Sequence, residues 1–104
     1  MSRKRYKVSA RILDKRGRVL SEGHNSYTKT HPLQALHAKR VGLPHKCFLH
    51  AEIHAIARCK QLDRAHRIIV ERYDEDGNPR CARPCAVCER AILDSGIKRV
   101  EFTC

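Results

Sequence analysis

The chain contains no tryptophan, one methionine and only 5% aromatic residues, so isoleucine, valine, leucine and alanine must form most of the core. It has no internal repeat, and no stretch approaches the roughly 20 apolar residues of a membrane span. The basic N-terminus leads into no apolar run of signal-peptide length. We therefore expect a soluble cytoplasmic protein with no membrane partner.

Acidic residues are also scarce, with 11 Asp and Glu against 22 Lys and Arg, which gives a formal net charge of +11 and a calculated pI near 9.9. An excess of positive charge on a small protein favours ligands that carry phosphate, such as a nucleotide or a nucleic-acid backbone. The alternative is that these side chains only solvate the surface.

A length of 104 residues suits one domain, and we predict a single domain over residues 1–104. Six cysteines in a chain without a signal peptide indicate a reducing compartment more than a disulfide scaffold. Two of the six have metal-binding spacing. The other four carry no such pattern, and we expect them to be small buried side chains: Cys47, Cys59, Cys81 and Cys104.

Hydrophobic periodicity predicts alternating strands and helices. In order, we expect strands at 6–14 and 19–24, a short helix from Pro32, a helix at 51–62, a strand at 67–73, a helix from Pro84 to Ser95, and a strand at 97–103. Gly17 supplies the first hairpin turn, and Gly96 supplies a C-terminal helix cap. The pattern predicts an α/β protein with a mixed sheet covered by helices.

His50-Ala51-Glu52 and the later Pro84-Cys85-Ala86-Val87-Cys88 both fall at predicted helix starts. One imidazole and two thiolates give zinc three protein ligands and leave a fourth tetrahedral position for water, as in catalytic zinc sites. Cys85 and Cys88 share a helix face, where the positive end of the helix dipole lowers the cost of a thiolate. The sequence therefore predicts a zinc site held by His50, Cys85 and Cys88.

Glu52 lies two residues beyond the predicted histidine ligand, where it can move protons to and from a zinc-activated water. The rival pair of His50 and His54 does not have the metalloprotease spacing around its glutamate and leaves the two cysteines unexplained. A closed structural zinc site is the other alternative, but it normally uses a fourth protein ligand. We predict Glu52 as the catalytic residue of a hydrolytic enzyme.

These motifs, His-x-Glu followed by Pro-Cys-x-x-Cys, resemble those of the cytidine and deoxycytidylate deaminase superfamily. The likeness covers most of the chain. It implies a cytidine-deaminase-like three-layer α/β fold with a mixed sheet of four or five strands and helices on both faces. Many relatives continue beyond the position of Cys104, so the resemblance implies a small version, short at its C-terminus, with a more open site unless a partner covers it. It also implies homo-oligomers.

Substrate contacts are predicted partly from the resemblance and partly from residue chemistry. Asn25 matches a position where the family often has an asparagine that contacts the sugar or base. Lys29 and His31 follow it in a loop suited to phosphate and ribose, although an ordinary solvated loop explains them as well. Ala51 and Pro84, beside the metal ligands, complete the predicted contacts.

The resemblance implies hydrolytic removal of an amine from C4 of cytosine or C6 of adenine. We favour cytosine because the overall likeness is to the cytidine and deoxycytidylate branch. We favour a free pyrimidine nucleotide or nucleoside because the few aromatic residues offer little base stacking to a polynucleotide. Single-stranded DNA or RNA is the alternative substrate, favoured by the net charge. A zinc-stabilised nucleic-acid-binding module without catalysis is a third reading, against which Glu52 counts.

Overall fold

The computed structural model describes residues 6–26, 32–42 and 50–103. Predictions that concern Lys29, His31, Cys47 and Cys104 lie outside these residues. Within the described part, no helix is both long and apolar enough to cross a bilayer.

The first two strands, β1 (Lys7–Leu13) and β2 (Val19–His24), form the predicted antiparallel hairpin. Gly17 has a φ of +83°, the left-handed conformation that the short turn requires. In this register Ala10 lies opposite Gly23. Alternate residues of the hairpin therefore face the helices with small or apolar side chains.

Three further strands complete a five-stranded mixed sheet, and the predicted fold class is confirmed. Strand β3 (Arg67–Tyr73) pairs antiparallel with β1. Its other edge is shared by β5 (Arg99–Phe102), which runs parallel to its first half, and by β4 (Pro79–Arg80), which is antiparallel to its end. The sequence did not predict β4, whose two residues are too few for a periodic pattern.

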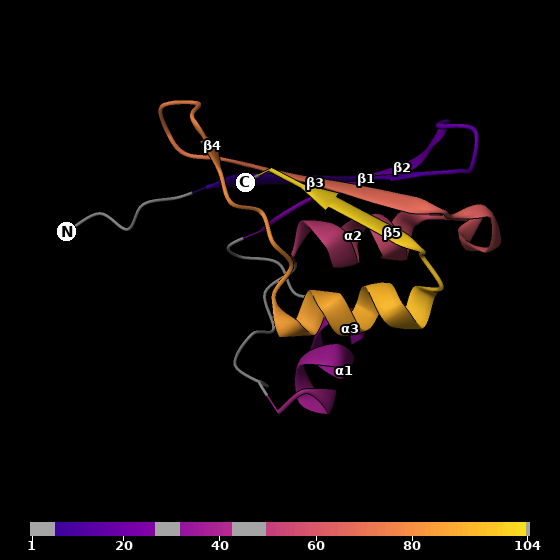
Figure 1. Ribbon diagram of the computed structural model, residues 1–104. Helices are drawn as coiled ribbons and strands as arrows, with labels where there is room; N and C mark the ends of the chain where they lie inside the picture. The colour runs from indigo at the N-terminus through magenta and orange to yellow at the C-terminus, as the bar shows by residue number, and fades with distance from the viewer. Residues whose placement is uncertain (1–5, 27–31, 43–49, 104) are drawn as a thin grey trace.

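The described helices are α1 (Pro32–Arg40), α2 (Ala51–Arg58) and α3 (Ala86–Ser95). All three lie on the same side of the sheet, with α2 against the strands and α3 and α1 beyond it (Figure 1). The α/β class and the mixed sheet agree with the prediction, but the predicted placement of helices on both faces does not, because the described helices cover one face only (Figure 1). The opposite face carries charged side chains, including an ion pair of 2.8 Å between Arg11 and Glu71, and so offers a helix little apolar surface.

Helix α2 is shorter than its predicted range of 51–62. It ends at Arg58, Cys59 adopts an extended conformation, and a single 3₁₀ turn, η1 (Leu62–Arg64), follows. The chain must reverse here to enter β3, so the tertiary path overrides the helical period. Helix α3 ends as predicted, because Gly96 is its left-handed C-cap with a φ of +83°.

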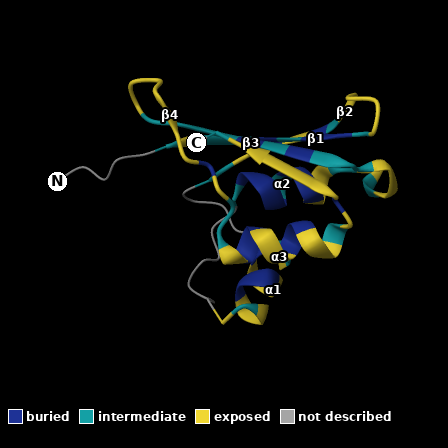
Figure 2. Ribbon diagram, in the orientation of Figure 1, coloured by how far each residue is buried: buried dark blue, intermediate teal, exposed yellow. Residues whose placement is uncertain are grey.

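The core lies between the sheet and α2, where dark blue segments face each other in Figure 2. Ile12 and Ile68 from the sheet and Ile53 from α2 are fully buried. Gly23 lets α2 approach closely, since a Cβ at that position would collide with the backbone of Ala51 and Ala55. The first turn of α2 is therefore held directly on β2, which fixes the position of the residues around His50.

Candidate metal centre

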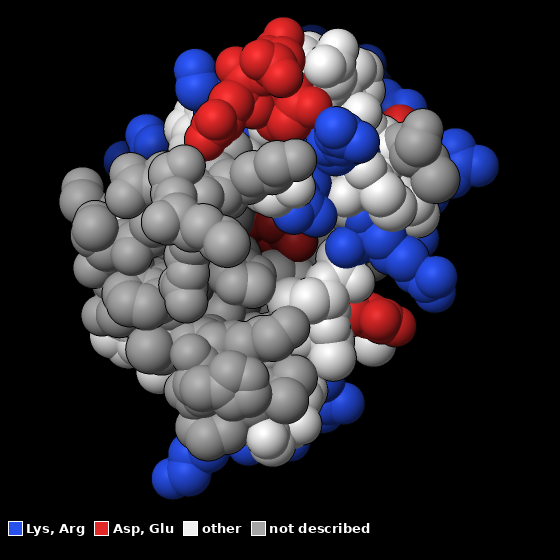
Figure 3. All heavy atoms as spheres, turned by 90° about the vertical axis from the view of Figure 1, so that its left-hand side faces the viewer, with Lys and Arg blue, Asp and Glu red and all other residues white. Residues whose placement is uncertain are grey.

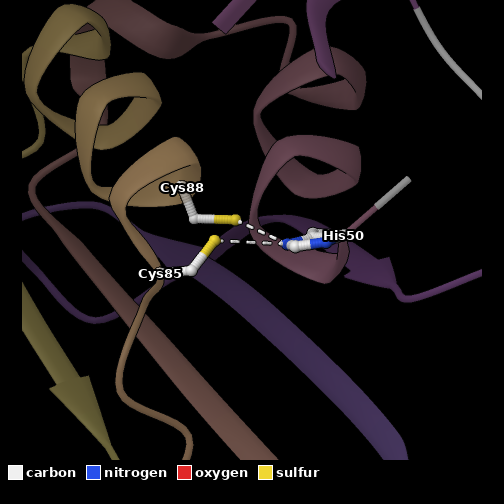
Figure 4. Close-up of side chains that lie close together, drawn as sticks. All are labelled: His50, Cys85 and Cys88. Carbon is white, nitrogen blue, oxygen red and sulfur yellow. Dashed lines mark hydrogen bonds between the residues drawn. The ribbon is translucent and has the colours of Figure 1, made fainter. Parts of the chain in front are cut away.

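His50, Cys85 and Cys88 meet at the starts of two helices, in the group that the sequence predicted (Figure 4). His50 is the N-cap residue of α2, Cys85 is the N-cap residue of α3, and Cys88 lies in the first turn of α3. Because α2 and α3 pack against each other, their N-termini bring residues 35 and 38 positions apart into contact.

The distances within this group suit a tetrahedral zinc ion. The Nδ1 atom of His50 lies 3.2 Å from Sγ of Cys88 and 3.6 Å from Sγ of Cys85. Zinc with Zn–N near 2.0 Å and Zn–S near 2.3 Å would hold a nitrogen and a sulfur roughly 3.5 Å apart. The three atoms all lie within 4.8 Å of one another, and the described residues add no fourth protein ligand to them. This donor set can hold zinc and leave one position for water.

Electrostatics also prepares the two sulfurs for a cation. The hydrogen bond from the Cys88 thiol, together with that from His50, lowers the pKa of Cys85 to about 3. The same bond to Cys85, together with burial, raises the pKa of Cys88. These opposite shifts favour the thiolate on Cys85, and the thiolate is the form of cysteine that binds zinc. Zinc binding to both sulfurs would release the proton of Cys88.

Glu52 lies beside this group in the first turn of α2, and only 5% of its surface is exposed. Burial raises the pKa of Glu52 above its ordinary value, while hydrogen bonding to Cys88 and the charge of His50 act in the opposite direction. A buried carboxyl with a raised pKa holds a proton more readily than an exposed one, which suits a group that accepts and returns a proton. The arrangement places such a group next to the open metal position.

Gln34 is a site residue that the sequence did not indicate. It is fully buried on α1, and its Oε1 accepts a hydrogen bond of 3.2 Å from the backbone N–H of His50. The N-terminus of α2 has no side-chain cap from His50 itself. Gln34 therefore binds the backbone of a predicted metal ligand from another helix, a relation that no local spacing could reveal.

Thr103 supports the segment that leads to the two cysteines. Its Oγ1 donates to the carbonyl of Arg80 at 2.6 Å, and its carbonyl accepts from the N–H of Ala82 at 2.8 Å. Its own N–H donates to Val70 in β3 at 3.1 Å. These bonds fix residues 80–82 against the sheet, three residues before Cys85.

Asn25, predicted as a substrate contact, lies at the end of β2. Its Oδ1 accepts from the N–H of Val8 and its Nδ2 donates to the carbonyl of Tyr6, both at 3.1 Å. The side chain thus bridges the start of β1. Of the other described predicted contacts, Ala51 is buried as the first residue of α2, and Pro84 is partly buried just before Cys85.

His54 does not join the metal group found among the described residues, which agrees with its rejection as a ligand. Its Nδ1 accepts from the backbone N–H of His24 at 3.0 Å, so it links α2 to β2. Cys59 is partly buried and Cys81 is exposed. The prediction of a buried side chain is wrong for Cys81, which lies in the extended segment after β4 rather than on a core-facing element.

Figure 3 shows the end of the molecule at which α2 and α3 begin. A hollow on this face has acidic atoms at its bottom and Lys and Arg side chains beside it. One exposed cation of the described chain, Arg83, comes directly before Pro84. The Lys and Arg side chains beside this hollow favour anionic ligands in general.

An imidazole and two cysteine sulfurs around one open position, with a buried carboxyl alongside, define a zinc-dependent hydrolytic class of protein. Residues 2–104 match the family model described as the cytidine and deoxycytidylate deaminase zinc-binding region. The chain belongs to this family of zinc-dependent deaminases. A search of curated proteins found no match.

Proposed function

We propose that this deaminase converts cytosine to uracil in a free pyrimidine nucleotide or nucleoside. The observation that carries the proposal is the group of His50, Cys85 and Cys88 with buried Glu52 beside it. We assign the first three as zinc ligands and Glu52 as the catalytic residue. We further propose that residues 1–104 act as one domain, in the cytoplasm, with homo-oligomers as an expected assembly.

In the proposed reaction, bound zinc supplies the Lewis acidity that makes water nucleophilic near neutral pH. Glu52 takes a proton from the attacking water, and the oxygen bonds to C4, the carbon that carries the amine. Glu52 passes this proton to ring N3 and then carries the proton of the new C4 hydroxyl to the amine. The C–N bond breaks, ammonia leaves, and the C4 oxygen becomes the carbonyl of uracil. One water is consumed for each cytosine converted to uracil.

Substrate positioning is assigned to residues around this centre. Ala51 and Pro84 flank the metal ligands in sequence, and we propose that their backbone and ring line the base. Asn25 holds the start of β1 through its amide, which leaves one further lone pair and one N–H for a sugar or base. Lys29 and His31 are proposed to contact phosphate and ribose.

Glu52→Gln tests the assignment of the catalytic residue. The amide has the shape of the carboxyl but cannot shuttle a proton, so zinc content should be unchanged while turnover falls by at least about 100-fold. Metal analysis and ammonia release measure the two effects. Normal activity in this variant would overturn the mechanism.

A polynucleotide is the second candidate substrate, favoured by the net charge of +11. Mass spectrometry after incubation with cytidine, deoxycytidine, their monophosphates, adenosine and a mixed-sequence single strand separates the candidates. Conversion of an amine to a carbonyl adds about one dalton. A strand that is bound without any mass change would favour the non-catalytic binding module instead.

A further inference from the structure

A second hollow, of about 680 Å³, lies between the β1–β2 turn, the η1 turn and the connection from α3 to β5. We call it the distal basic hollow. Five of its nine lining residues are cationic and two are acidic. The cations come from three separate segments: Lys15, Arg16, Arg18, Arg64 and Lys98.

The distal basic hollow and the metal centre lie at opposite ends of the hairpin. Helices α2 and α3 begin at one end of the molecule, and the β1–β2 turn lies at the other (Figure 1). A strand of seven residues, the length of β1, spans roughly 20 Å. A single nucleotide cannot occupy both places, whereas a chain of several nucleotides can.

The cations of the hollow are available for a ligand. In the part of the chain that the structure describes, none of the five forms an ion pair with a carboxylate. The nearby acid, Asp14, accepts backbone N–H bonds of 2.9 Å from Arg16 and from Arg18. Those bonds shape the turn, so that Asp14 holds the loop that presents the cations.

The lining offers phosphate contacts but little for a base. It contains no Phe, Tyr or Trp, and its one ring is the imidazole of His66. A free nucleotide held there would leave its base without a stacking surface, which single-strand readers normally supply. Several separated cations around a wide hollow fit the repeated phosphates of a backbone instead.

We propose that the distal basic hollow binds the phosphodiester backbone of a single-stranded polynucleotide, about 20 Å from the metal centre. This inference rests on the second candidate substrate of the proposed function. A deaminated base must leave its stack, so a single strand is the form that can reach the zinc and the hollow together. The hollow would anchor the strand without reading its sequence.

The test compares two triple variants of the full, zinc-loaded chain. R16A/R64A/K98A removes one cation from each segment of the hollow, and the control K7A/K39A/R90A removes three exposed cations elsewhere. Each lowers the net charge from +11 to +8. Fluorescence anisotropy with a labelled single strand of about 15 nucleotides measures affinity over a range of salt concentrations.

The hollow variant should bind at least about tenfold more weakly at low salt, with a log–log salt slope smaller by roughly 2, because each single-strand phosphate contact contributes about 0.7. The control variant should lose less than about threefold in affinity for the strand. Equal losses in both variants would show a general field effect and overturn the proposal. Stronger binding of the matching duplex than of the single strand would also overturn it. A hollow variant that loses affinity for inorganic phosphate or cytidine triphosphate but keeps its affinity for the strand would overturn it as well.

Two further measurements keep this result independent of catalysis and of folding. Binding is repeated on Glu52→Gln, which should bind the strand as the unaltered chain does, because the inference does not depend on turnover. If the unaltered, zinc-loaded chain binds strands but deaminates no substrate, the proposed function is refuted and this inference stands. Thermal melting establishes that the variants fold, and K98A alone provides a milder change if the triple variant does not. An unchanged affinity in folded K98A and in folded R64A would overturn the proposal.

Discussion

Gln34 is the buried amide that joins α1 to the metal centre, and its substitution should affect zinc as well as stability. Gln34→Leu keeps the volume but removes the acceptor of the His50 N–H. Losing this part-buried hydrogen bond should cost about 0.5–1.5 kcal/mol of unfolding free energy and weaken zinc binding. Urea melts and competition with a chelator measure both.

The matched control is Gln61→Leu, at an exposed glutamine beside η1. It should leave zinc affinity unchanged. Equal zinc affinity in the two variants would contradict the role of Gln34 as a positioning residue for His50.

Gly23 should tolerate no side chain, because α2 lies directly over it. Gly23→Ala forces α2 away from β2, with an expected loss of about 1–3 kcal/mol and a lower zinc affinity. Gly77→Ala is the comparison, since Gly77 has a φ of +83° but open space around it. It should cost about 1 kcal/mol through backbone strain and leave zinc binding unaffected. Urea melts and competition with a chelator distinguish the two variants. Unchanged zinc affinity in Gly23→Ala would refute the role of Gly23 in positioning α2.

At the residue scale, the metal group was predictable because zinc chemistry dictates its residue types and spacing. His50, Cys85 and Cys88 could be recognised from two short motifs. Gln34 could not, because its role exists only after α1 packs against the start of α2. The same holds for Gly23, whose close contact with α2 depends on the hairpin register.

At the scale of elements, the contact between α1 and α3 should respond to pH. His37 on α1 is only 4% exposed, and its Nδ1 lies 3.6 Å from Oδ2 of Asp94 on α3. Burial lowers the pKa of His37 below its ordinary value, although Asp94 opposes this shift. As pH falls below about 6.5 the unfolded chain binds a proton that the folded chain resists. Stability should therefore decrease on acidification.

Urea midpoints measured between pH 7.5 and pH 5.5, values chosen about one unit either side of the ordinary histidine pKa, test this expectation. His37→Gln should flatten the dependence, while His24→Gln, at an exposed position, should preserve it. If the urea midpoint changes with pH equally in His37→Gln and in the unaltered chain, then His37 is not the source of the pH dependence.

Helices and strands with a complete hydrophobic period were predictable from the sequence, whereas element ends that depend on the tertiary path of the chain were not. The hairpin and the Gly96 cap followed from alternation and from glycine chemistry. The end of α2 at Arg58 did not, because the apolar spacing continues to Leu62 while the chain turns toward β3. The side on which each helix packs also carries no local signal.

At the scale of the whole molecule, zinc should contribute to folding. The predicted ligands come from the starts of α2 and α3, so a bound ion would join two elements that pack against each other. Zinc at about 100 times its dissociation constant should add about 2.7 kcal/mol. For a chain of this size that corresponds to a shift of more than about 10 °C in Tm.

Differential scanning calorimetry before and after chelation measures the shift. Added zinc should restore the original Tm, and added magnesium, which prefers oxygen ligands, should not. An apo protein with an unchanged Tm would show that the ion is not needed for stability.

The net charge was evident from composition, but its distribution was not. The distal basic hollow draws its cations from the hairpin turn, from Arg64 and from Lys98, which are far apart in sequence. Only the folded arrangement of these three segments brings them around one space.

The distance along the chain between the metal ligands also sets when the protein can acquire its ion. Cys88 is made 38 residues after His50. At synthesis rates of about 5–20 residues per second, the imidazole exists for several seconds before its second sulfur partner. Metal loading therefore cannot precede the synthesis of Cys88, and until zinc binds, the two thiols are open to oxidants that would compete with zinc for them.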